Sequence, residues 1–145
     1  MKLEAIHAEW EVDSRIDETE IVREEGRIPL LHAKYLRLLS EERMLKRKLE
    51  EDLRVMEADV ADRLTGVMSQ EDLESRGWSP ERRRYLRSEV SPAVQVDPQV
   101  VELKLRVALQ AEKVDVLDSI VRSIMNRNFI LKGMIDWIKF RSGAL

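Results

Sequence analysis

Apolar residues recur at spacings of three, four and seven along much of the chain, a pattern typical of helices that bury one face. The stretch 3–12 follows this pattern, and a much longer stretch follows it from Pro29 to about Leu64. Because no glycine or further proline interrupts the longer stretch, we predict one helix of roughly 35 residues. Gly66 predicts its end. A helix of this length favours packing against partner helices.

Serine, glycine and proline residues divide the second half of the chain into shorter elements. Ser69 is a predicted helix N-cap and Gly77 a predicted helix stop. Ser79-Pro80-Glu81 predicts a new helix with proline in its first turn. Residues 91–98 predict a linker of extended character, and Asp97-Pro98 predicts the start of a last helical region. The polar residues 126–128 predict a kink or an end within that region.

The segment from Phe129 to Phe140 is apolar at eight of its twelve positions. A helix that is apolar nearly all round must be buried from several sides, and this chain has little material to do so alone. We therefore expect the segment to join copies of the chain, whereas a core helix of a monomeric bundle is the alternative. The expected interface residues are Phe129, Ile130, Met134, Trp137 and Ile138.

The composition agrees with helices throughout. Glycine and proline number only 5 and 4 of 145 residues, and charged residues make up 37%. This argues against a β sandwich or barrel and favours long solvated helices. We predict an all-α fold, an elongated helical bundle with one long central helix. By function we expect two regions, 1–91 for DNA or partner binding and 92–145 for oligomerisation.

No enzyme site is recognisable. The chain has no cysteine and no phosphate-binding glycine loop, and we expect its two histidines, His7 and His32, to serve packing. We therefore predict a protein that is not an enzyme and that uses no metal ion or cofactor. No long uncharged apolar run and no signal peptide are present, so we expect a soluble intracellular protein without membrane contact.

Charges alternate in blocks along the chain, although the net charge is only −3. Residues 26–54 and 76–91 each carry a net charge of +3, whereas residues 1–25 carry −6. Basic surfaces can form where positive segments meet, although ordinary solvated helix faces give the same pattern. The basic runs also lie near aromatic residues in the sequence, namely Tyr35, Trp78 and Tyr85.

Proteins that bind single-stranded nucleic acid use cationic side chains along the phosphates and aromatic rings on which the bases stack. For each ring taken singly, core packing is the favoured role, and the arginines could equally contact acidic helices of a neighbouring protomer. One basic run lies between Arg43 and Arg54, and a second one extends from Arg82 to Arg87. The predicted nucleic-acid contacts are Arg43, Lys46, Arg47, Lys48, Arg54, Arg63, Arg82, Arg83 and Arg84.

Several segments, in their order and spacing, make the sequence resemble the UvsY family, the recombination mediators of myovirus-type tailed phages and their cyanophage relatives. These segments include Asp13–Asp17, Ile28–Leu36, Gly77–Pro80, Glu112–Ile120 and Arg127–Lys132. The resemblance implies a ring-like homo-oligomer, hexameric or heptameric, in the cytoplasm of an infected bacterial host. It also implies three partners, which are single-stranded DNA, the phage single-strand-binding protein and a RecA-like recombinase whose loading the protein promotes.

The resemblance fails at one place that matters for DNA contact. The family's Lys-x-Arg pair falls on Ala58 and Val60, and its tyrosines fall on Arg63 and Leu64, when Gly66 is aligned. Either DNA contact has moved to the basic residues named above, or this chain binds DNA weakly, or it contacts protein partners instead. The competing hypothesis is a structural coiled-coil or adaptor protein without direct nucleic-acid binding.

Overall fold

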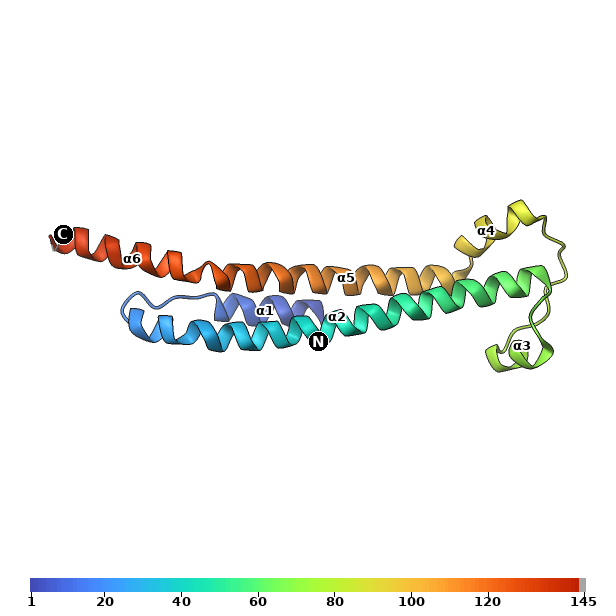
Figure 1. The fold of residues 1–145 in the computed structure, drawn as a ribbon, viewed down its shortest axis with the longest axis horizontal. Helices are drawn as coiled ribbons and strands as arrows, with labels where there is room; N and C mark the ends of the chain where they lie inside the picture. The colour runs from blue at the N-terminus through green and yellow to red at the C-terminus, as the bar shows by residue number, and fades with distance from the viewer. Residues whose placement is uncertain (144–145) are drawn as a thin grey trace. The chain divides into compact units, whose positions relative to one another are not determined.

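The computed structural model describes residues 1–143, which are helical over most of their length (Figure 1). The helices are α1 (Leu3–Asp13), α2 (Ile21–Thr65), α3 (Gln70–Arg76), α4 (Arg87–Gln95), α5 (Pro98–Met125) and α6 (Arg127–Ser142). No strand occurs among the described residues, so the predicted all-α fold is confirmed. The chain forms two compact units, unit 1 (Met1–Met44 and Ala111–Leu145) and unit 2 (Leu45–Gln110).

These units divide the chain by packing. The division by function into 1–91 and 92–145 is a different one, since each unit contains residues of both regions. It stays a prediction, and its last two residues lie outside the part of the chain that the structure describes.

Unit 1 is held together by one hydrophobic core between α1, α2 and α5. Helix α2 contributes Leu31, Tyr35 and Leu39, whose spacing of four residues places them on one face. Helix α1 adds Ile6, and α5 faces these side chains with a stripe of its own. The residues of that stripe are Val114, Leu117, Ile120, Val121 and Ile124. The apolar residues that recur at helical spacing in the sequence therefore form this core.

A buried ion pair ties the start of α6 to the start of α2. The guanidinium of Arg127 lies 3.1 Å from the carboxylate of Glu24, and the two side chains are only 4% and 5% exposed. Arg127 also donates to the backbone carbonyls of Asp13 and Arg15, at 3.2 and 3.0 Å. Burial alone would raise the pKa of Glu24, but hydrogen bonds from Arg127 and Arg27 hold it below its ordinary value of 4.5. The pair is therefore charged at neutral pH.

Unit 2 has a smaller core between the second part of α2, α4 and the start of α5. Val60, Val94 and Val100 are its buried residues, one from each of these helices. Half-buried apolar side chains surround them, including Trp78 from the segment that follows α3. Helix α4 and the segment that precedes it, which border the basic pocket described below, are both anchored to this core.

Most predicted helix ends are confirmed. The side chain of Ser69 accepts a backbone N–H from the first turn of α3 at 3.1 Å. Gly66 and Gly77 follow α2 and α3 with φ values of +75° and +70°, a left-handed conformation that glycine adopts without strain. Asp97 accepts a backbone N–H of α5 at 2.9 Å, and the break predicted at residues 126–128 occurs at Asn126.

Helix α2 has 45 residues and begins at Ile21, so the predicted start at Pro29 was wrong. Pro29 lies inside the helix, although it has no N–H to donate to the carbonyl four residues before it. That carbonyl belongs to Glu25, and because Glu25 and Pro29 are both exposed, water can reach it. The core contacts of Leu31 and the ion pair of Glu24 hold the neighbouring turns, and these tertiary contacts outweigh the local preference.

The helix predicted to begin at Ser79 and Pro80 is absent. Residues 77–86 are non-helical, and the next helix starts only at Arg87. Within this segment the Glu81 carboxylate accepts the backbone N–H of the residue two positions later at 3.0 Å, a local turn that competes with helix formation.

The extended linker predicted at residues 91–98 was also wrong, because residues up to Gln95 belong to α4. Val90 and Val94 lie four residues apart and both pack on the core of unit 2, which favours the helix. Pro92 sits on its exposed side.

His7 is exposed, so the packing role predicted for it was wrong, while His32 is half-buried. The described residues contain no group of three or more His, Cys, Asp or Glu residues that could hold a metal ion. None of the helices within residues 1–143 has the length and apolar character to cross a membrane.

The substitution Arg127→Ala tests the buried ion pair. It leaves the Glu24 carboxylate with the half-exposed Arg27 as its remaining cationic partner. We expect the free energy of unfolding at pH 7 to fall by about 3–5 kcal/mol, because a buried charge loses its main compensation. Because the pKa of Glu24 is lower in the folded chain, the stabilisation by the pair is complete above the ordinary value of 4.5 and is lost as the pH falls through the lowered pKa.

Urea unfolding of both proteins at pH 7 and at acidic pH measures this difference. Arg122→Ala is the matched control, since it removes an ion pair with Asp118 whose arginine is 76% exposed. The control should unfold like the wild type. Equal losses in the two variants would contradict a special role for the buried pair.

Candidate nucleic-acid interface

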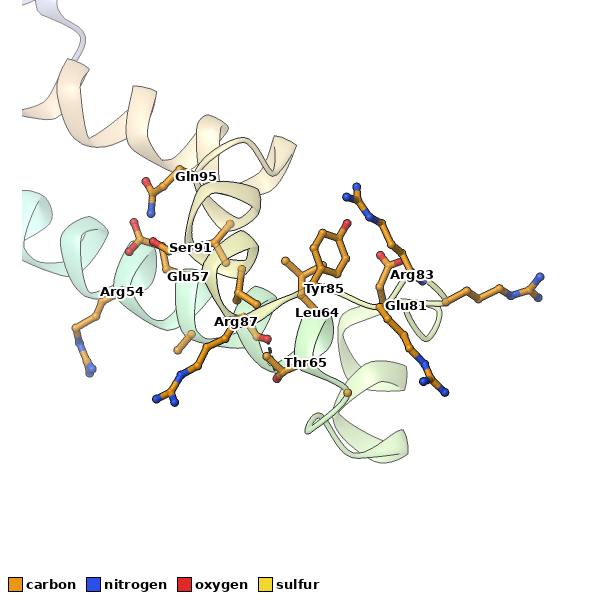
Figure 2. Close-up of a pocket in the computed structure, with 17 residues that line it drawn as sticks. Arg54, Glu57, Leu64, Thr65, Glu81, Arg83, Tyr85, Arg87, Ser91 and Gln95 are labelled. Atoms are coloured by element: carbon orange, nitrogen blue, oxygen red, sulfur yellow. Dashed lines mark hydrogen bonds between the residues drawn. The ribbon is translucent and has the colours of Figure 1, made fainter.

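Unit 2 contains a broad pocket with a volume of about 1050 Å³ (Figure 2). It is bordered by the C-terminal part of α2, by α4 and by the non-helical segment that precedes α4. Part of its lining is apolar, formed by Ala58, Ala61, Leu64, Val90 and Val94. The charged lining residues are Arg54, Arg82, Arg83, Arg84, Arg87, Glu57 and Glu81. Five arginines against two glutamates make the pocket electropositive.

Three of these arginines keep their charge free of acidic partners. Arg82, Arg84 and Arg87 are exposed, and within residues 1–143 their guanidinium groups make no hydrogen bond or ion pair. On a helix, an arginine commonly pairs with an acidic residue three or four positions away. Because Arg82 and Arg84 lie in a non-helical segment, they have no such neighbour at helical spacing. Their donors remain available for charge-assisted hydrogen bonds to an anion.

The other two arginines at the pocket have local partners. Arg54 pairs with Glu51 one turn earlier on α2, and the guanidinium of Arg83 lies 4.6 Å from the centre of the Tyr85 ring. Figure 2 shows the side chains of Arg54 and Arg87 extending on one side of the pocket, with Arg83 beside Tyr85 on the other. Cationic groups therefore border the apolar surface from two sides.

A wall of the pocket carries uncharged hydrogen-bonding groups beside a carboxylate. Ser91 and Gln95 come from α4, and Glu57 comes from the facing part of α2 (Figure 2). The carbonyl oxygen of the Gln95 side chain accepts a hydrogen bond from Lys104. The wall thus offers both donors and acceptors to a ligand in the pocket.

The basic run on α2 lies outside this pocket. Arg43 and Lys46 each lie near a carboxylate, at 3.4 and 3.8 Å. Arg47 and Lys48 are exposed, and neither forms an ion pair in the part of the chain that the structure describes. Of the predicted contacts, the pocket therefore brings together Arg54 and the run Arg82–Arg84.

Arg63 holds the non-helical segment that precedes Arg82–Arg84. It donates to the backbone carbonyl of Ser79 at 2.9 Å, and its guanidinium lies 5.7 Å from the centre of the Trp78 ring. Arg76 lies 5.5 Å from the same ring, and the indole N–H donates to Gln99 at 3.1 Å. The ring is therefore held within unit 2 by contacts of its own. The role of Arg63 as a DNA contact stays a prediction.

Tyr35 is not a surface platform, because it is completely buried in the core of unit 1. Its ring meets that of Trp10 edge-on at 5.4 Å, and its hydroxyl donates to Asp13 at 2.7 Å. Burial and this carboxylate together raise the pKa of Tyr35, so the hydroxyl remains protonated. Among the three rings considered from the sequence, Tyr85 is the one that lines the pocket.

Sequence reasoning did not include several pocket residues among the predicted contacts. Arg87 belongs to the same basic run and could have been included on that ground. Ser91 and Gln95 could not, because their segment was expected to be an extended linker. Their place in the pocket follows from the unexpected extent of α4.

Helix α6 presents a second unusual surface, an apolar one. Leu131 is completely buried, whereas Phe129 and Trp137 are 76% and 59% exposed. The Trp137 ring stacks on that of Phe140 with a centroid distance of 5.7 Å. Among the predicted interface residues, those with large exposed side chains are Phe129, Ile130, Trp137 and Ile138, whereas Met134 is half-buried.

Comparison with protein families identifies the class to which this all-helical chain belongs, the recombination and repair proteins. A family model described as "Recombination, repair and ssDNA binding protein UvsY" matches residues 9–144. Because the match extends over nearly the whole sequence, the chain belongs to the UvsY family. The resemblance noted from the sequence is thereby confirmed, while the relation to cyanophage homologues stays a prediction. The family description names binding and repair and no catalytic activity.

Solved structures agree on the fold. A crystal structure of the bacteriophage T4 recombination mediator protein UvsY in lattice type IV matches with a TM-score of 0.84 at 21% identity, over 97% of this chain and 99% of that one. The lattice type II structure gives a TM-score of 0.83 at 22% identity, with 98% of both chains covered. No curated protein matches the chain in a sequence search. At such low identities the similarity establishes a shared fold.

Proposed function

We propose that this chain is a recombination mediator that binds single-stranded DNA, weakens the hold of the phage single-strand-binding protein and promotes loading of a RecA-like recombinase. The observation that carries the proposal is the pocket of unit 2, where unpaired, exposed arginines gather in a member of the UvsY family. Phosphate groups are the natural ligands of such arginines, and they supply most of the affinity in sequence-independent binding. The proposed place of action is the cytoplasm of an infected bacterial host.

The replaced basic pair of the family fits this proposal. Val60 is buried in the core of unit 2 and cannot reach a strand, but Ala58 lines the arginine-bordered pocket. Positive charge that the family carries on α2 can therefore be supplied here by Arg82, Arg84 and Arg87 from the facing segment and α4. This supports relocation of DNA contact over its loss.

The second part of the proposal is self-assembly into a hexamer or heptamer through α6. Its exposed apolar side chains, above all Phe129 and Trp137, would be covered by neighbouring copies. Each copy then contributes a weak basic surface to a shared one. Linking several weak sites can raise the overall affinity by about 10²–10⁴ without a new kind of contact.

Such an assembly would hold a strand at several points at once. A strand bound along several pockets is bent and kept away from its single-strand-binding protein, which leaves a stretch on which a recombinase filament can start. ATP chemistry belongs to the recombinase in this scheme.

The competing hypothesis is an adaptor protein in which the arginines pair with acidic helices. Within the described residues of one chain, Arg82, Arg84 and Arg87 have no such pairing, which favours a nucleic-acid ligand. Pairing across copies is the form of the adaptor hypothesis that remains, and DNA-binding measurements on the assembled protein test it directly.

Fluorescence anisotropy with a labelled oligothymidine, at about 50 and about 200 mM salt, tests the DNA contact. We expect binding by the wild type that weakens with salt, because phosphate contacts release counterions. The triple variant R82A/R84A/R87A should bind more weakly, and its log–log salt slope should be shallower by about 2 per chain, from about 0.7 for each lost contact. The matched control R37A/R106A/R122A removes the same charge from exposed arginines that pair with acidic residues one turn away. No binding by the wild type at low salt would support the adaptor hypothesis.

Size-exclusion chromatography with light scattering tests self-assembly. We expect a wild-type mass six or seven times that of the chain, and a smaller mass for F129K/W137K, because charges on the apolar face of α6 cannot be buried between copies. V22K/V67K is the control, since these valines are 86% and 73% exposed and lie outside α6. A wild-type monomer at micromolar concentration would contradict the assembly.

A further inference from the structure

The pocket of unit 2 contains more than phosphate contact requires. A phosphate chain needs only the arginines, which stand at the solvent-facing border. The apolar surface between them is formed by Ala58, Ala61, Leu64 and neighbouring valines. It would remain exposed to water if only the sugar–phosphate backbone of a strand were bound. The pocket's volume of about 1050 Å³ slightly exceeds the range of about 300–1,000 Å³ that is typical of sites for small organic ligands. The pocket therefore has room and apolar surface for a flat group that arrives together with phosphates.

We propose that the pocket receives one nucleobase of the bound strand, turned out of the base stack, while the flanking phosphates contact the arginines at its border. This inference rests on the proposed binding of single-stranded DNA and adds the place and the manner in which a base is held. Each copy in the assembly holds one such base.

The chemistry of the lining matches a nucleobase. Leu64 and the valines offer an apolar surface to the face of the ring, and the Tyr85 ring with the guanidinium of Arg83 above it lies at the border. Aromatic rings and guanidinium planes are the groups on which unpaired bases stack. Stacking of this kind is tolerant of sequence, because every base has a flat face.

The polar wall fits the edge of a base. Glu57 can accept a hydrogen bond from a base N–H, and Ser91 and the Gln95 amide can donate to a ring nitrogen or a carbonyl oxygen. Every base carries at least one N–H group on its pairing edge, so the wall does not select one base. An acidic peptide, the other ligand that arginines attract, would meet the carboxylates of Glu57 and Glu81 inside the pocket. The two glutamates therefore favour a base over an acidic side chain.

Insertion of a base has a consequence for the strand. A base held in the pocket no longer stacks on its neighbours, so the backbone must turn at that nucleotide. A series of pockets would impose a turn at regular intervals, which is incompatible with an uninterrupted stack.

The test compares two ligands and two variants by fluorescence anisotropy of the full-length assembled protein. The ligands are an oligothymidine and a strand of equal length made of abasic sugar phosphates, which differ only in the bases. A58L/S91L fills the pocket from exposed positions on its two helices and leaves every arginine in place. A33L/S88L is the control, since these residues are exposed on the same two helices and do not line the pocket.

We expect the wild type and the control to prefer the thymidine strand to the abasic strand by at least about fivefold, from stacking free energies of about 1–3 kcal/mol per base. A58L/S91L should bind both strands as weakly as the wild type binds the abasic one. The single variants A58L and S91L carry the test if the double variant does not fold, and each should lose part of the preference.

Two results would overturn the inference while leaving DNA binding intact. One is salt-dependent binding of both strands by the wild type with no preference between them. The other is a preference for the thymidine strand that A58L/S91L retains in full. In that case, binding of an acidic peptide by the wild type that is lost in A58L/S91L would assign the pocket to a protein ligand. If the wild type binds neither strand at low salt, the proposed function itself fails.

Discussion

Packing of the apolar stripe of α2 is the interaction on which both units depend. In unit 1 the stripe meets α1 and α5 through Leu31, Tyr35 and Leu39, and in unit 2 it meets α4 and α5 through Val60. Burial of this stripe fixes which residues of α2 remain on the outside, since positions on a helix are not independent. Ala58 is on the outside for this reason, two residues before a buried position, and so it becomes part of the pocket surface.

The extent of the helices was predictable wherever local chemistry acts alone. Ser69, Gly77 and Asp97 cap or end helices by hydrogen bonds and backbone preferences that the sequence displays directly. The prolines were misleading because a proline in the first turn and a proline inside a helix have the same sequence signature. Which of the two occurs at Pro29 and Pro92 depends on packing by residues around them, and spacing alone does not contain that information.

The basic character of the candidate site was predictable from the sequence, but only some of the residues that form it were. The run Arg82–Arg84 was evident from the sequence, and the structure gathers it with Arg54 across unit 2. That juxtaposition depends on the path of a non-helical segment fixed by Arg63, so no periodicity could have revealed it. Tyr35 shows the opposite case, in which a ring close to basic residues in sequence is buried in a core. Proximity in sequence therefore identified the charge of the site better than its stacking surface.

The non-helical segment 77–86 has a consequence for the life of the protein in a cell. Exposed connecting segments are where proteases cleave first, and trypsin-like enzymes cut after arginine. Arg82, Arg83 and Arg84 are consecutive, exposed and outside any helix, so they form a ready cleavage site in the empty protein. Occupancy by a polyanion would shield the same peptide bonds. The same non-helical path that leaves Arg82 and Arg84 without acidic partners in the described part of the chain would thus make the half-life of the chain depend on whether a ligand covers it.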